Sequence, residues 1–201
     1  MTRRDTLPPI QQPSATEVQK YLTKWNEGNN EKLDSALKTL FQVMPRNDDV
    51  GEVAVKLAAL NGIYSTNIFA VVQVAAHIAN LDIDKKLAEP AVDPDLIEEI
   101  ATFTIKGKAR RNYSFATKYC AFHRPDLYPI YDSLVANALN TLLRQGEEFD
   151  SFTPGERWQA DYAVWNRSIT KFRTHYGLDA FSIRDIDKYL WMLAKERQSL
   201  K

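Results

Sequence analysis

The sequence predicts an all-α protein with two lobes, and three observations support this prediction. Apolar residues recur at the three- and four-residue spacing of amphipathic helices from Ser14 onward. No stretch shows the alternating β-branched pattern, bounded by turn residues, that marks a strand. With 201 residues, of which 44% are hydrophobic and 26% charged, the chain has the composition of a globular protein. Its length suits one large domain or two small lobes.

The helices can be placed in order along the chain. Residues 1–13 hold three of the nine prolines and no apolar period, which predicts a flexible N-terminal arm ahead of a single domain at 14–201. Within this domain the apolar spacing predicts helices at 15–26, 31–44, 49–60, 65–80, 93–103, 113–123, 133–145, 156–176 and 183–197.

Two parts of this pattern predict packing. The helix at 65–80 is apolar on most faces from Ile68 to Ala79, so we expect it to run through the interior. The helix at 156–176 carries an aromatic stripe that we expect to pack on the last helix. Ser182 and Asp185 form a variant of the capping box at the start of that last helix, and Gly177 ends the helix before it.

Bulk composition excludes several classes of protein. Basic and acidic residues balance at 26 each, so any contact with DNA must come from a local patch. Cys120 is the only cysteine, which excludes an internal disulfide and fits a reducing, cytoplasmic compartment. The chain has no apolar signal core and no apolar run long enough to span a membrane. It also has no glycine-rich phosphate loop and no metal-ligand spacing, so we expect neither a cofactor nor a metal. We also expect the protein to be a monomer. His77 is interpreted as a hydrogen-bonded core residue.

A basic segment without acidic residues is the main functional signal. Six cations and no carboxylate lie between Glu99 and Asp126. The segment 93–123 is interpreted as a helix, a hairpin at Gly107 and a second helix, where backbone N–H groups and the helix dipole favour a phosphate. Such contacts hold duplex DNA regardless of its sequence, although a solvated basic loop remains the alternative. The predicted DNA contacts are Lys106, Gly107, Lys108, Arg110, Arg111, Asn112 and Lys118.

The link at 124–132 ends in Asp132, directly before the apolar run SLVANALNTLL. An aspartate in this place is a preferred helix N-cap. The stretch YPIYDSLV resembles the sequence that follows the hairpin in the helix-hairpin-helix superfamily of DNA glycosylases, with Asp132 at the position of their catalytic aspartate. The motif likeness covers about 95–145. This chain has one glycine in the hairpin where the family commonly has two, and its link is one residue longer.

The resemblance implies an enzyme that flips a damaged or modified base out of double-stranded DNA and hydrolyses its N-glycosidic bond, in repair or antiphage defence. A fixed anion at Asp132 would stabilise the oxocarbenium-like transition state and orient water; a cap without catalysis is the alternative. Some members use a lysine at the start of the second hairpin helix, where this chain has Asn112 or Tyr113. Because Lys108 and Lys118 do not fit that position, we expect a monofunctional enzyme that leaves an abasic site.

Further candidates are less specific. The base pocket is predicted at Asn61, Tyr64, Ser65 and Asn67, for which capping and a turn at Asn61-Gly62 are the alternative reading. Arg167, Lys171 and Arg173 could line the other wall of a DNA cleft, but we favour a solvated helix face. Two rival functions remain: a noncatalytic helix-hairpin-helix DNA-binding module, and a helical interaction protein without a nucleic-acid role.

Overall fold

The computed structural model describes residues 8–200, and over this range the chain is mostly helical. The helices are α1 (Ala15–Glu27), α2 (Asn29–Val43), α3 (Val50–Tyr64), α4 (Val71–Ala79), α5 (Ile83–Ala88), α6 (Pro94–Ala101), α7 (Tyr113–His123), α8 (Ser133–Arg144), α9 (Tyr162–His175) and α10 (Ile183–Ser199). Strands β1 (Thr102–Ile105) and β2 (Lys108–Arg111) form one antiparallel pair.

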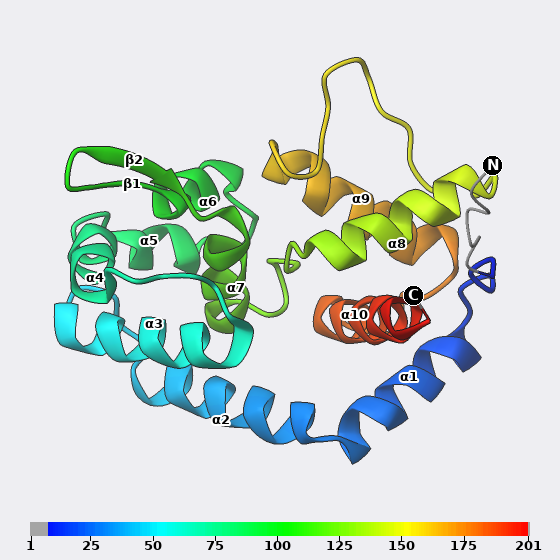
Figure 1. Ribbon diagram of the computed structural model, residues 1–201, viewed down its shortest axis with the longest axis horizontal. Helices are drawn as coiled ribbons and strands as arrows, with labels where there is room; N and C mark the ends of the chain where they lie inside the picture. The colour runs from blue at the N-terminus through cyan, green and yellow to red at the C-terminus, as the bar shows by residue number, and fades with distance from the viewer. Residues whose placement is uncertain (1–7, 201) are drawn as a thin grey trace.

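The helices fall into two groups (Figure 1). The middle lobe consists of α2 to α7 with the two strands, and the terminal lobe consists of α1, α8, α9 and α10. Helix α1 returns to the last helix, where the rings of Tyr21 and Tyr189 lie 5.6 Å apart. Lys24 Nζ also lies 2.7 Å from a carboxylate oxygen of Glu196. The terminal lobe is therefore built from both ends of the described chain.

Buried tyrosine hydroxyls join the two lobes. Tyr113, at the start of α7, donates a hydrogen bond of 3.0 Å to the carbonyl of Trp158. Tyr162, at the start of α9, donates one of 2.9 Å to the carbonyl of Pro129. The link at 124–132 passes between the lobes here, so residues at its end lie at the junction of the two groups of helices.

The predicted hairpin is present, but it is a β-ribbon, so the all-α prediction is wrong at this point. Residues 102–105 pair with 108–111. Lys106 and Gly107 both have positive φ, 48° and 73°, as a two-residue turn of type I′ requires. The helix predicted at 93–103 consequently ends at Ala101. The alternating stretch Thr-Phe-Thr-Ile is only four residues long, too short to stand out beside the cations.

The helix at 65–80 is shorter and less buried than its composition predicts. It begins only at Val71, and the side chains of Phe69 and Val72 are 88% and 63% exposed. Helix α3 covers one face of α4 and the other faces solvent, which corrects the expectation of an interior helix. Helix α3 itself continues to Tyr64, so the turn considered at Asn61-Gly62 does not form.

Three other features differ from the predictions: an additional helix, the start of α9 and the N-terminal segment. Helix α5 was not predicted, because its six residues are too few to show a period. Helix α9 starts at Tyr162, where the side chain of Asp161 caps it, and 156–161 belongs to the preceding loop. Residues 8–13 do not form a loose arm: Ile10 is buried and exchanges two hydrogen bonds of 2.9 Å with the side chain of Gln145. The rest of the predicted arm, 1–7, lies outside the described residues.

A buried polar cluster holds the middle lobe together. The side-chain oxygen of Asn47 lies 2.7 Å from Lys56 Nζ and 3.1 Å from His123 Nε2, and the hydroxyl of Tyr119 donates to the same oxygen. Because this amide oxygen can only accept, Nε2 of His123 carries the proton. Burial, with help from the charge of Lys56, lowers the pKa of His123 to about 3.

No helix among residues 8–200 combines the length and apolar character needed to cross a membrane.

Candidate functional site

Asp132 is the N-cap of α8, as predicted. Its Oδ1 accepts a hydrogen bond of 2.8 Å from the backbone N–H of Leu134. The side chain is partly exposed and lines a pocket at the junction of the lobes. Its other oxygen, Oδ2, has no hydrogen-bond partner within residues 8–200, which leaves it free to face water or a ligand.

The pocket that contains Asp132 is small and has aromatic walls. Its volume is about 30 Å³, room for one or two water molecules. Five helices (α1, α3, α7, α8 and α10) and the link contribute to it, so the site forms only when both lobes are assembled. Its lining consists of Trp25, Tyr64, Lys118, Ile130, Asp132, Val135, Arg184, Asp187, Lys188 and Trp191. We call this set the junction pocket.

Lys118 lies in the junction pocket and not on the DNA-binding surface predicted for it. The residue is only 4% exposed, because α7 carries it into the interior, and its Nζ donates a hydrogen bond of 2.6 Å to Ser114 Oγ. Burial lowers the pKa of Lys118 to about 8, although the charges of Asp132 and Asp187 act in the opposite direction. An amine of this kind is a better nucleophile than an exposed lysine. Lys118 and Asp132 therefore line the same pocket, although they belong to different elements of the chain.

An ionic cluster from both lobes forms one wall of the pocket. Arg184 of α10 contacts the carboxylate of Asp34 in α2, and its guanidinium lies 3.1 Å from the hydroxyl of Tyr64 in α3. Asp187 accepts a hydrogen bond of 3.0 Å from the N–H of Ile130. Burial raises the pKa of Asp187 to about 7, even though Arg184 and Lys118 favour its charged form.

The ionic cluster could not be predicted from the sequence. Arg184 and Asp187 are three residues apart on one helix face, a spacing typical of ordinary surface pairs. Their partner Asp34 is 150 positions away from Arg184. Only the return of α1 and α2 to α10 brings these residues together.

The four residues predicted as a base pocket do not converge. Tyr64 lines the junction pocket, but Asn61 turns its side-chain oxygen to the backbone N–H of Ile68, 2.9 Å away, and to the hydroxyl of Thr66. Ser65 and Asn67 are exposed and have positive φ, 49° and 60°. Asn61 therefore serves the local structure after α3 through its side chain, without the turn considered at Asn61-Gly62, whereas Asn67 lines a different groove.

The predicted DNA contacts on the ribbon divide into free and engaged residues. Lys106, Lys108 and Arg110 are exposed, and within residues 8–200 they have no ion-pair or hydrogen-bond partner. Arg111 is engaged: it pairs with Glu98, donates 2.8 Å to the carbonyl of Gln159, and stacks 4.5 Å from the ring of Tyr113. Arg111 therefore fastens the ribbon to both lobes.

A second and larger groove lies beside the ribbon. It has a volume of about 530 Å³. The ribbon contributes Phe103, Ile105, Lys106 and Arg110 to it, and the loop before α4 contributes the exposed ring of Phe69. Asn112 lies in its lining, and its side-chain amide donates a hydrogen bond of 3.4 Å to the carbonyl of Thr66. We call this the ribbon groove.

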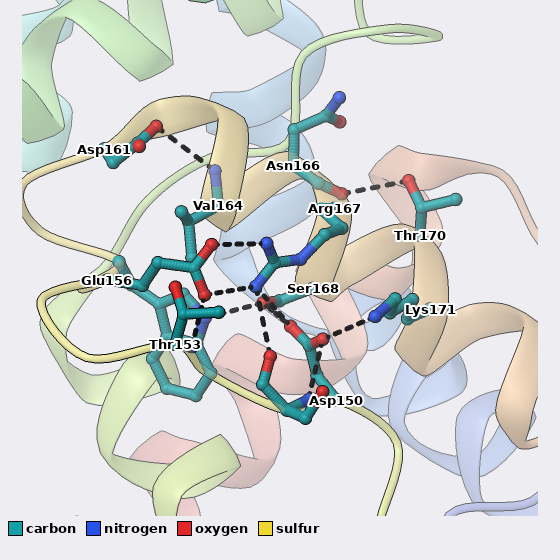
Figure 2. A network of polar contacts seen from close by, with 12 residues as sticks. Asp150, Thr153, Glu156, Asp161, Val164, Asn166, Arg167, Ser168, Thr170 and Lys171 are labelled. Carbon is teal, nitrogen blue, oxygen red and sulfur yellow. Dashed lines mark hydrogen bonds and ion pairs between the residues drawn. The ribbon is translucent and has the colours of Figure 1, made fainter.

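Two cations of α9, Arg167 and Lys171, form ion pairs with the loop that precedes the helix. Figure 2 shows Arg167 directed at Glu156 and Lys171 directed at Asp150, with nitrogen–oxygen distances of 2.7 and 2.9 Å. The carboxylate of Asp150 is fully buried and also accepts from Ser168. Lys171 is exposed, as expected for a solvated helix face, and Arg173 donates a hydrogen bond of 2.7 Å to the carbonyl of Asp179 beyond the helix. Arg167 and Lys171 are nevertheless engaged in ion pairs. They hold residues 146–161 against α9.

Among residues 8–200, no group of three or more histidine, cysteine or acidic side chains is arranged to hold a metal ion. His77, as predicted, is a hydrogen-bonded structural residue, since its Nε2 lies 2.8 Å from the carbonyl of Glu99.

The comparisons with known proteins identify a family but no activity. Residues 17–127 match the family HI_0787_N, described as an N-terminal domain. Because this match covers more than half of the 201-residue chain, the chain belongs to that family. The match contains the ribbon and Lys118, and it ends before Asp132.

A relative in Haemophilus influenzae, named only as an uncharacterized protein, is 38% identical over 137 residues. The aligned part is 68% of this chain and 63% of that protein, so the chain spans less than two thirds of the relative's length. No solved structure matches the chain.

Proposed function

We propose that this chain is a monofunctional DNA glycosylase, which flips a damaged or modified base out of duplex DNA and hydrolyses its N-glycosidic bond. The observation that carries the proposal is the position of Asp132. Its carboxylate stands at the junction of the lobes, is held through one oxygen by the first turn of α8, and belongs to a residue that lines a pocket with aromatic walls. The resemblance of YPIYDSLV to the helix-hairpin-helix glycosylases supports the same assignment.

The proposed chemistry follows from this arrangement. As the base leaves, the deoxyribose develops positive charge, which a fixed carboxylate stabilises. The hydrogen bond from the Leu134 N–H fixes the carboxylate of Asp132 at the start of α8. Its free oxygen can then orient the attacking water. Trp25, Tyr64 and Trp191 supply the aromatic surface on which an everted base would stack.

A nucleobase is larger than the closed junction pocket, so the proposal requires the pocket to open. Trp191 and Lys188 come from the same face of α10, and both are only partly buried. Rotation of these two side chains, or separation of the lobes, would widen the pocket when DNA binds.

The variant Asp132→Asn tests the proposal with little structural disturbance, because asparagine is as good an N-cap as aspartate. Wild type and variant are incubated with genomic DNAs that carry different base modifications. Abasic sites and released bases are then measured by mass spectrometry. We expect release to fall by orders of magnitude in the variant while thermal stability and DNA affinity persist.

Asp126→Asn is the matched control, since Asp126 lies in the same link but forms an exposed pair with Arg124. It should leave base release unchanged. Full activity of Asp132→Asn would contradict the mechanism, and a wild-type protein that binds DNA but releases no base would contradict the enzyme.

Strand nicking distinguishes a monofunctional glycosylase from a bifunctional one. A monofunctional enzyme leaves the abasic strand intact. A protein–DNA adduct trapped by borohydride, and absent in Lys118→Met, would instead show a bifunctional enzyme that uses the buried amine.

A noncatalytic DNA-binding module is the second candidate. The unpaired ribbon cations and the small volume of the junction pocket favour it, because both fit DNA contact without base capture. In that case Asp132 serves only as a cap.

A further inference from the structure

The loop before α4 has a defined local structure that leaves the ring of Phe69 exposed to solvent. Ile68 is buried, and its N–H is held by the side chain of Asn61. Ser65 and Asn67 adopt left-handed backbone conformations that non-glycine residues rarely adopt. Phe69 directly follows this fastened segment and is 88% exposed. The exposure of Phe69 is thus fixed by the backbone on its N-terminal side.

The same ring stands beside positive charge. Phe69 and the side chains of Lys106 and Arg110 line the ribbon groove together. Val72, at the start of α4, is 63% exposed and adds a second exposed apolar side chain three residues after Phe69. An aromatic face flanked by unpaired cations is the combination that binds single-stranded nucleic acid, since bases stack on the ring and phosphates pair with the cations.

We propose that the ribbon groove binds a strand of nucleic acid, with Phe69 stacked on a base and Lys106 and Arg110 paired with phosphates. Charge complementarity selects this occupant. No described residue neutralises these two cations, and the net charge of the whole chain is zero, so the positive field is local to the ribbon. The inference deepens the proposed function, because it assigns the surface that grips the DNA strand, but it does not require any base to be released.

The amide groups of Asn67 and Asn112 also line the groove. Amides both donate and accept, so they can contact base edges or sugar oxygens without adding charge. Asn112 is already fixed by its bond to the carbonyl of Thr66, which makes Asn67 the freer of the two.

The test measures binding of the full chain, in the Asp132→Asn background, to fluorescein-labelled oligonucleotides by anisotropy. Single-stranded and duplex forms are compared, and one base is replaced by 2-aminopurine, whose fluorescence is quenched by stacking. We expect Phe69→Ala to weaken binding about 5- to 150-fold and to abolish the quench. Phe69→Trp should preserve both, because it keeps an aromatic face.

Two variants separate stacking from charge. Arg110→Gln should weaken binding and reduce the slope of log affinity against log salt by about 0.7 to 0.9, whereas Phe69→Ala should leave that slope unchanged. Val43→Ala is the matched control, since Val43 is also exposed, at 67%, and lies outside the groove lining. Circular dichroism of each variant verifies the fold, which is expected to persist because Phe69 is largely solvated.

Wild-type affinity and quench in Phe69→Ala would overturn the inference. So would Phe69→Ala converting a dimer to a monomer in ultracentrifugation without changing DNA affinity, because the ring would then serve contact with a second copy of the chain. Loss of binding in Phe69→Ala, in a protein that releases no base, would uphold this inference and contradict only the glycosylase proposal.

Discussion

At the scale of single residues, burial and ion pairing decide which charged side chains can meet a ligand. Lys118 and Arg111 belong to the same basic run as Lys106 and Arg110. Lys118 is buried against Ser114, and Arg111 is exposed but paired with Glu98. Lys106, Lys108 and Arg110 are exposed and have no side-chain partner within residues 8–200. The sequence predicts a basic segment here, but it does not show which of its cations are accessible and which are engaged within the protein. That depends on which face of α7 and of the ribbon contacts the rest of the molecule.

Asp132 and the predicted base-pocket residues show how far local sequence rules can place a side chain. The capping role of Asp132 was predictable from one local rule and is confirmed. Asn61, Tyr64, Ser65 and Asn67 do not line one common pocket, because α3 continues through Asn61-Gly62 to Tyr64 and the chain then changes direction at Ser65 and Asn67, which have positive φ. Proximity in sequence predicts shared location only when the local backbone is known.

His123 should make the protein sensitive to acid. Its pKa falls from 6.5 to about 3 on folding, so between these values the unfolded chain binds a proton that the folded chain does not. The free energy of unfolding should therefore decrease as pH falls from 6.5 towards 3. Urea titrations across this range measure it. In His123→Gln, which keeps an N–H donor for Asn47 without titrating, the pH dependence should be shallower, and an unchanged dependence would contradict the role of His123.

At the scale of elements, long amphipathic helices were predictable and short or irregular pieces were not. Helices α1, α7, α8 and α10 begin and end within two residues of their predicted limits, because each has a clear cap or an apolar period of several turns. The β-ribbon and α5 are too short to show a period. Their stability comes from pairing and packing with distant segments, which local patterns do not record.

The loop at 146–161 is an element that depends on one carboxylate. Asp150 has no exposed side-chain surface and receives Lys171, Arg167 and Ser168 (Figure 2). Asp150→Asn should lower the free energy of unfolding by about 2 kcal/mol, the usual cost of losing hydrogen bonds to a charged group. It should also speed proteolysis within the loop.

Asp179→Asn is the control for the loop, because Asp179 forms an exposed pair with Arg173 at 3.9 Å and should contribute little. Equal stability of the two variants, or equal cleavage of the loop, would show that the buried network does not hold this segment.

At the scale of the whole molecule, the two lobes share one ionic cluster. Arg184 of the terminal lobe contacts Asp34 and Tyr64 of the middle lobe. Two small lobes were one of the two arrangements that the length of the chain suggested. The cluster that couples the lobes was not, since its members lie at opposite ends of the sequence.

Arg184→Leu tests this coupling. It leaves Asp34 with Lys188 and the hydroxyl of Tyr64, each at 3.4 Å. The free energy of unfolding should therefore fall by about 3 kcal/mol, as when one partner of a buried pair is removed. Tryptophan fluorescence and circular dichroism, followed in the same urea titration, should give one transition for the wild type and diverge in the variant. Arg46→Leu, which removes an exposed pair with Asp48, should have no measurable effect on either. Coincident, undisplaced transitions in Arg184→Leu would refute the coupling.

The pairing of α1 with α10 also dictates an order of events during synthesis. Trp25 leaves the ribosome long before its neighbour Trp191, whose ring lies 5.7 Å away in the finished protein. Helices α2 to α7 can assemble meanwhile, since every segment that they need is already translated. The junction pocket around Asp132, however, stays incomplete until α10 is synthesised, so a nascent chain can expose its cationic ribbon before this pocket exists.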